Sequence, residues 1–166
     1  MTRLVNNLIK DGYLRTDRII DAFSEISRIE FVPKEFELQA EADIALPIGY
    51  GQTISQPLTV ALMFELLDLQ EGQKILDVGS GSGWTTALLS YIVGEKGKVI
   101  AIERKEELKK IGERNVDKFK YIKIGRARFF SGDGSLGFSQ EAPYDRILVS
   151  AAAESVPEEL KKQLKI

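Results

Sequence analysis

The sequence contains neither cysteine nor histidine. The absence of cysteine excludes disulfide bonds and thiolate metal ligands, and the absence of histidine excludes imidazole ligands and histidine general bases. Any catalysis therefore depends on carboxylates, hydroxyls, backbone amides and a bound cofactor, and we expect no metal site.

Long apolar segments are also absent. No run approaches the roughly 18 residues of a membrane span, and the N-terminal residues lack the apolar core of a signal peptide. The net charge of −2 gives no overall attraction for nucleic acid, so that only a local basic patch could bind it. A chain of 166 residues, 43% hydrophobic and 29% charged, is typical of one globular domain. We expect a cytoplasmic protein without a nucleic-acid or membrane partner.

The first part of the chain shows helical periodicity. Apolar residues recur at helical spacing in 4–9 and again in 17–26, where Thr16 is the expected N-cap. Residues 43–57 are expected to form a loop, because glycine and proline bound them. Pro57 suits the first turn of the next helix. The apolar positions of that helix include Leu58, Ala61, Leu62, Leu66 and Leu67.

From residue 73 onward, strand-like and helix-like segments alternate. We expect strands at about 74–78, 98–102, 126–131 and 145–150, and helices at about 83–93 and 105–119. Alternation of this kind implies a parallel sheet with right-handed crossovers. The expected fold class is therefore α/β, a Rossmann-like, doubly wound and mostly parallel sheet preceded by an N-terminal helical segment.

The most informative motif is a glycine-rich turn between a predicted strand and a predicted helix. Gly79 and Gly81 follow the strand that holds Asp77, and alternate glycines let a ligand approach the amides at the helix start. A dinucleotide fingerprint needs a third glycine where Trp84 stands, and Asp77 disfavours a pyrophosphate. The turn favours a cationic ligand without phosphate, such as S-adenosylmethionine; a plain turn is the alternative.

Two more acidic residues stand at predicted strand ends. Glu103 ends the second strand, twenty-four residues after Gly79, where an acid can accept hydrogen bonds from ribose hydroxyls. Asp133 lies between two glycines after the third strand. Each residue also has a simpler interpretation: Glu103 as an exposed glutamate at a helix start, and Asp133 as part of a common loop. The strand ends of one parallel sheet converge on a single crevice, however, which favours a shared binding site.

The loop at 43–57 carries three polar side chains, Gln52, Thr53 and Ser55, between glycines and a proline. Hydroxyls at this position could orient a substrate carboxylate. A turn whose hydroxyls are satisfied by their own backbone is the alternative.

Residues 43–57, Asp-Ile-Ala-Leu-Pro-Ile-Gly-Tyr-Gly-Gln-Thr-Ile-Ser-Gln-Pro, resemble the signature of the protein-L-isoaspartate O-methyltransferase family. The glycine-rich turn, the Gly-Asp-Gly turn at 132–134 and the segment 142–152 also match, in the family's order, as does Phe-Val-Pro at 31–33. The resemblance covers essentially the whole chain. Gly-Gln-Thr-Ile-Ser-x-Pro is its most specific element, since many methyltransferases share the glycine turn.

The resemblance implies a class I methyltransferase that uses S-adenosylmethionine to methylate the carboxylate of L-isoaspartyl residues in damaged proteins, which begins their repair. Residues 1–57 would supply helices and the active-site loop, and 58–166 the cofactor-binding core of the same domain. It implies Ser55 and Thr53 as catalytic residues. The cofactor-binding residues that it implies are Gln52, Asp77, Gly79, Gly81, Glu103, Asp133 and Gly134.

The sequence departs from the family in two respects. Leu58 stands where members often carry an aromatic residue or histidine, and the family continues beyond Ile166 into further strands. We therefore expect the C-terminal strands to be absent and the apolar strand at 145–150 to be exposed, and so available for self-association. Two rival functions stay open: a methyltransferase acting on RNA or a small molecule, and a cofactor-binding protein without turnover.

Overall fold

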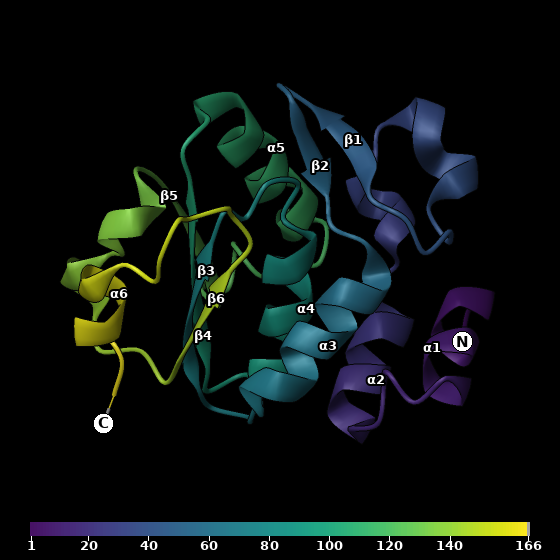
Figure 1. Ribbon diagram of the computed structural model, residues 1–166, viewed down its shortest axis with the longest axis horizontal. Coiled ribbons are helices and arrows are strands. Elements are labelled where there is room, and N and C mark those ends of the chain that lie inside the picture. The colour runs from purple at the N-terminus through teal and green to yellow at the C-terminus, as the bar shows by residue number, and fades with distance from the viewer. Residues whose placement is uncertain (166) are drawn as a thin grey trace.

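A four-stranded parallel sheet organises the protein, whose computed structural model describes residues 1–165. The strands lie in the order β5-β4-β3-β6, with helices on both faces (Figure 1). Their bounds are Lys74–Val78 for β3, Lys98–Glu103 for β4, Ala127–Ser131 for β5 and Arg146–Val149 for β6. All four predicted strands and the predicted α/β fold class are confirmed, with ends shifted by a residue at most.

The two central strands are mostly apolar because both of their faces are covered. Ile75 and Val99 pack into one cluster with the larger helices, whereas Leu76 and Ile100 pack on the opposite face. β6 is the last strand on its side of the sheet in the described chain, and Val149 at its end is 37% exposed. Self-association through this strand stays a prediction.

The larger helices cover one face of the sheet (Figure 1). They are α4, Trp84–Val93, and α5, Glu106–Asp117, with α3, Pro57–Leu67, in contact with β6. The short α6, Glu158–Lys162, covers the other face together with the 3-10 turns Gly134–Leu136 and Ser139–Glu141. Both helices predicted between the strands are confirmed.

The N-terminal segment shares the core of the sheet domain. Helices α1, Arg3–Lys10, and α2, Asp17–Glu25, form where periodicity predicts them, and Phe23 of α2 meets Trp84 of α4 edge-on at 5.6 Å. Two 3-10 turns, Arg28–Phe31 and Lys34–Gln39, follow. Thr16 stands at the N-cap position as predicted, but its hydroxyl donates to the Glu65 carboxylate, 2.8 Å away, rather than capping α2.

The loop predicted for 43–57 is wrong over its central part, which forms a β-hairpin. Strands β1, Leu46–Gly49, and β2, Gln52–Ile54, pair antiparallel around Tyr50 and Gly51, whose φ angles are 53° and 70°. Two left-handed residues in a two-residue connection match the twist of a hairpin. The glycines that indicated a loop are therefore the turn of a short hairpin.

Helix α3 begins at Pro57 as predicted, but part of the apolar set predicted for it faces solvent. Leu62 and Leu66 are exposed, whereas Val60 and Phe64 are fully buried. Apolar residues occur on almost every side of α3, so periodicity alone could not select the face that packs against the core.

One close approach joins α5 to the glycine-rich turn. A Cβ added at Gly112 would lie 2.8 Å from the carbonyl oxygen of Gly81 and 3.3 Å from the amide nitrogen of Gly83. Backbone atoms at such distances cannot yield without moving the turn. Glycine at 112 thus sets the distance between α5 and the loop after β3.

We predict that Gly112→Ala lowers the free energy of unfolding by up to about 2 kcal/mol. Alanine favours a helix interior by about 1 kcal/mol over glycine, but overpacking against backbone costs about 1–3 kcal/mol. Urea unfolding measures the balance, with the exposed substitution Lys110→Ala on the same helix as control. A variant more stable than the parent by about 1 kcal/mol would show that α5 moves away at no cost.

Candidate active site

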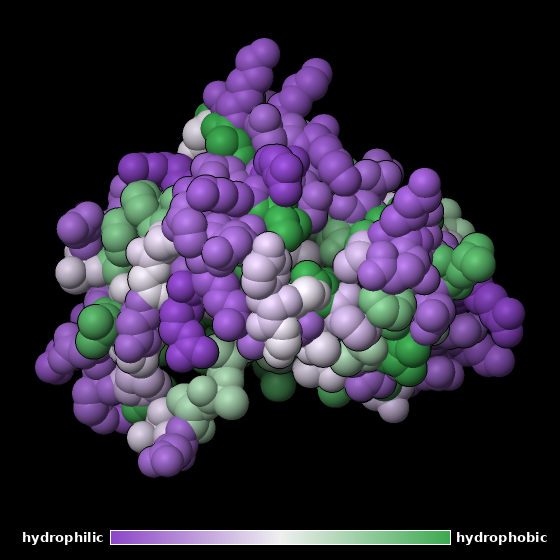
Figure 2. Space-filling view, turned by 90° about the horizontal axis from the view of Figure 1, so that it is seen from above, coloured by the Kyte–Doolittle hydropathy of each residue, from purple (hydrophilic) through white to green (hydrophobic). Residues whose placement is uncertain are grey.

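A cavity of about 400 Å³ opens at the carboxyl ends of the sheet strands, the edge where open α/β folds bind ligands. This edge faces the viewer in Figure 2, where hydrophilic side chains cover much of the surface. Seven of the predicted site residues line the cavity: Gln52, Thr53, Gly79, Gly81, Glu103, Asp133 and Gly134. The structure therefore brings together residues that lie up to 82 positions apart in the chain.

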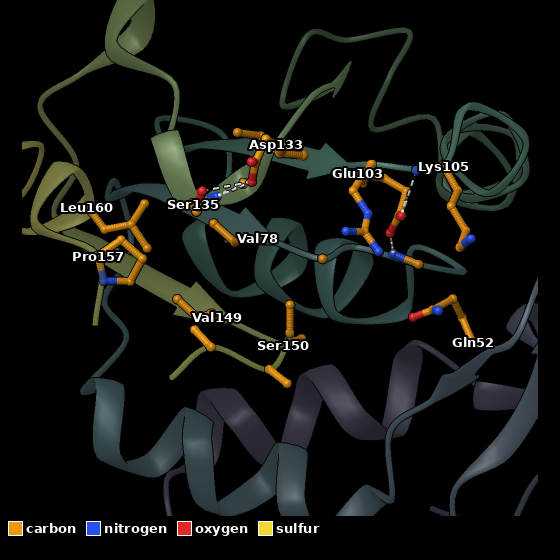
Figure 3. Close-up of a pocket in the computed structure, with 18 of the residues that line it drawn as sticks. Gln52, Val78, Glu103, Lys105, Asp133, Ser135, Val149, Ser150, Pro157 and Leu160 are labelled. Carbon is orange, nitrogen blue, oxygen red and sulfur yellow. Dashed lines mark hydrogen bonds between the residues drawn. The ribbon is translucent and has the colours of Figure 1, made fainter. Parts of the chain in front are cut away.

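Glu103 is buried at the end of β4 with only 8% of its surface exposed. One carboxylate oxygen accepts a hydrogen bond from the Gly81 amide at 2.9 Å, and the other accepts one from the Lys105 amide at 3.0 Å (Figure 3). Each oxygen keeps another lone pair. The carboxylate is thus held rigidly and can still accept two hydroxyl donors from within the cavity.

Asp133 lies at the other end of the cavity, after β5 (Figure 3). Its carboxylate accepts hydrogen bonds from the backbone amide and the hydroxyl of Ser135, which lower its pKa below the ordinary value. The adjacent position 134 has no room for a side chain larger than that of glycine, because a Cβ added at Gly134 would lie 2.3 Å from Cγ1 of Val78. This contact seats the Gly-Asp-Gly turn directly against β3.

The glycine-rich turn directs its amides into the protein rather than toward the cavity. The amides of Gly79 and Ser80 both donate to the Ile102 carbonyl, at 2.9 and 3.2 Å, and the Gly81 amide donates to Glu103. Gly79 and Gly81 have φ angles of 82° and 52°, the left-handed region that glycine tolerates. A phosphate would find these three amides already bonded, which favours a ligand without phosphate.

Asp77 is set apart from the other predicted cofactor residues. Its side chain is fully buried, and Oδ2 accepts hydrogen bonds from the hydroxyls of Thr85 at 2.9 Å and Thr86 at 2.6 Å. Burial raises the pKa of Asp77 to about 6, partly offset by these two bonds. The carboxylate ties β3 to α4 and lies outside the residues that line the cavity, so its contact with a cofactor stays a prediction.

A second cavity of about 30 Å³ adjoins the first and contains Ser55 in its wall. Thr53, Gly79, Gly81 and Ser150 line both cavities. Three polar atoms of this wall are buried without a hydrogen-bond partner in the described chain: Ser80 Oγ, Trp84 Nε1 and Ser150 Oγ. The smaller cavity is therefore rich in unused hydrogen-bonding groups.

The sequence interpretation missed these three residues. Ser150 follows the fourth strand, so the rule that ligands bind at strand ends could have identified it. Ser80 lies within the glycine motif itself. Trp84 departs from a dinucleotide fingerprint, but no pattern in the sequence indicates that its indole faces a cavity.

A family model, described as protein-L-isoaspartate(D-aspartate) O-methyltransferase, matches residues 1–166. The chain belongs to this family. A protein-L-isoaspartate O-methyltransferase from Methanopyrus kandleri is 46% identical over 163 residues, which cover 98% of this chain and 71% of that protein. One from Methanothrix thermoacetophila is 45% identical over 150 residues, which cover 90% of this chain and 70% of that protein.

Solved structures of the family share the fold. One protein-L-isoaspartate O-methyltransferase superposes with a TM-score of 0.87 at 37% identity, covering 98% of this chain but only 51% of its own length. A β-aspartate methyltransferase structure from Plasmodium falciparum, in complex with S-adenosyl-L-homocysteine, has a TM-score of 0.86 at 26% identity. The match covers 98% of this chain and 78% of that protein. The predicted family and its methyl donor, S-adenosylmethionine, are confirmed.

Residues 1–165 contain no group of three or more acidic, histidine or cysteine side chains arranged to hold a metal ion. In the same residues, no helix combines the length and the hydrophobicity that crossing a membrane requires.

The raised pKa of Asp77 predicts a pH-dependent stability. The folded protein binds the Asp77 proton more tightly than the unfolded chain, so this group's contribution to stability declines as pH rises from about 4 to about 6. Asp77→Asn lacks that decline. We expect the stability of the variant relative to the parent to increase by up to about 3 kcal/mol between pH 4 and pH 7.

Urea unfolding of parent and variant at the two pH values measures the difference. Asp11→Asn, an exposed substitution that removes the same charge, serves as the control. A stability difference between Asp77→Asn and parent that is the same at both pH values would contradict the prediction.

Proposed function

We propose that this chain transfers a methyl group from S-adenosylmethionine to the α-carboxylate of L-isoaspartyl residues in damaged polypeptides. The observation that carries the proposal is the pair of adjoining cavities, a large one at the sheet edge and a small polar one beside Ser55. Family membership across the whole chain supports it. The family signature holds both Ser55 and the shared residue Thr53.

The larger cavity suits the methyl donor. Glu103 offers two fixed oxygens for the ribose hydroxyls, Asp133 and Gly134 lie where the adenine would bind, and Gly79 and Gly81 border the space for the methionine part. The amides of the glycine turn are engaged in the protein, which agrees with a ligand that carries no phosphate. When bound, S-adenosylmethionine supplies an activated methyl group.

The smaller cavity suits the acceptor. Its 30 Å³ hold about two water-sized atoms, which matches the two oxygens of a carboxylate. The hydroxyls of Ser55, Ser80 and Ser150 would donate to those oxygens. A carboxyl group is already ionised at pH 7, so alignment rather than a general base limits the transfer, and the absence of histidine is compatible with the chemistry.

The cytoplasmic location expected from the sequence and the pairing of β6 with a second copy are further parts of this proposal. The second rests on the position of β6 at the end of the strand order in residues 1–165.

We predict that Glu103→Gln weakens S-adenosylmethionine binding at least about tenfold. A charge-assisted hydrogen bond contributes about 1.5–3 kcal/mol, and an amide keeps only one acceptor oxygen. Calorimetry with S-adenosylmethionine measures the loss. Glu106→Gln, on the exposed start of α5, is the matched control. Equal affinity in Glu103→Gln and parent would remove Glu103 from the cofactor site.

We predict that Ser55→Ala lowers kcat at least about tenfold and leaves S-adenosylmethionine affinity within twofold, because the lost hydroxyl orients the acceptor. The assay follows labelled methyl transfer to a peptide that contains L-isoaspartate, with its normal aspartyl isomer as the control substrate. Thr59→Ala, exposed on α3, is the control variant.

The same assay tests the proposed function. Methyl transfer by the parent protein to the isoaspartyl peptide, but not to the aspartyl peptide, supports the proposed function. Cofactor binding without transfer to either peptide would contradict it and favour a protein without turnover, whereas transfer to RNA or a small molecule instead would favour the rival methyltransferase.

A further inference from the structure

Arg28 is a cation buried in the core between the N-terminal segment and the active-site loop, with 4% of its surface exposed. Its guanidinium lies 5.3 Å from the ring centroid of Trp84. Four hydrogen bonds of 2.8–3.2 Å run from its two terminal nitrogens to backbone carbonyls, those of Ala40, Ala42, Ile44 and Ser55. Arg28 thus joins the segment before the hairpin to the residue just after it.

Asp43 holds the same part of the chain from the other side. One of its oxygens accepts a hydrogen bond from the Leu58 amide at 2.8 Å, and the other accepts one from the Gln56 side chain at 3.1 Å. The carbonyl of Ser55 is therefore held by Arg28, and Gln56 and Leu58, which follow it closely in the chain, are held by Asp43.

Stability alone is a weak reason for this arrangement. Burying a guanidinium is costly, and no ion pair of the described residues involves Arg28. Burial lowers its pKa to about 10, with Asp43 acting in the opposite direction. A well-packed apolar side chain could fill such a site at less cost, but it could not bind four carbonyls of two separate segments at once.

We propose that Arg28 and Asp43 are positioning residues that fix the backbone of residues 55–58 and thereby aim the Ser55 hydroxyl into the smaller cavity. Neither residue lines either of the two cavities. Both act through Ser55, and this inference rests on the proposed methyl transfer at that residue. The planar fork of the guanidinium, rather than its charge alone, performs the task.

The kinetic test compares Arg28→Met and Arg28→Lys with the parent on the isoaspartyl peptide. We expect kcat of Arg28→Met to fall about 10- to 100-fold, with S-adenosylmethionine affinity within twofold, because small misplacements of a reacting group have effects of this size. Arg28→Lys keeps the charge and loses the fork, so its kcat should stay at least about fivefold below the parent. Full rescue by lysine would overturn the role of the fork.

Arg126→Met is the matched control. Arg126 also stacks on an aromatic ring, that of Tyr121 at 5.1 Å, and donates to the Ser90 carbonyl, but it lies outside both cavities. We expect Arg126→Met to lower the melting temperature without changing kcat. Equal kcat in the Arg28→Met and Arg126→Met variants, measured where both are folded, would overturn the proposal.

Hydrogen exchange provides a readout that does not require turnover. Amides of residues 52–56 and of Leu58 should exchange faster in Arg28→Met and in Asp43→Ala than in the parent, while Arg126→Met leaves them unchanged. If Arg28→Met does not fold, Asp43→Ala carries both tests. Unchanged exchange in this segment would refute the positioning role. If exchange is faster in the variants but the parent protein methylates neither peptide, only the proposed function is refuted.

Discussion

The hydrogen bond from the Gly81 amide to the Glu103 carboxylate joins the ends of two neighbouring strands and determines the shape of the site. It can form only because β3 and β4 are parallel and end at the same edge of the sheet. Gly112 then allows α5 to lie against the carbonyl of Gly81, so the turn is held from both sides. The part of the cavity wall between β3 and β4 is consequently fixed by the sheet and its crossover helix.

Most of the sheet could be predicted from the sequence, because buried parallel strands are short apolar runs between turn signals. The hairpin could not, since its strands are only four and three residues long and its glycines equally suit a loop. The exposed face of α3 escaped prediction for a related reason. A helix that is apolar on most sides gives no period from which to choose, and only the surrounding core decides that Phe64 rather than Leu66 is buried.

Some residues of the candidate site could likewise be predicted from the sequence, and others could not. Residues at strand ends, such as Glu103 and Asp133, follow from topology once the strands are known. Asp77 shows the limit of the motif: the residue before a glycine turn can point into the adjacent helix, where Thr85 and Thr86 bind it. The bonds of Arg28 reach carbonyls 12 to 27 residues later in the chain, distances at which no local sequence pattern indicates a contact.

The inward-facing amides of the glycine turn also bear on competition in the cell. Nucleotides such as ATP and NAD carry an adenosine that Glu103 and Asp133 could accept, but their phosphates would meet a turn whose donors are already bonded within the protein. Phosphate desolvation would then go uncompensated at that point. The turn is therefore expected to disfavour phosphate-bearing nucleotides in the cavity relative to a sulfonium ligand without phosphate.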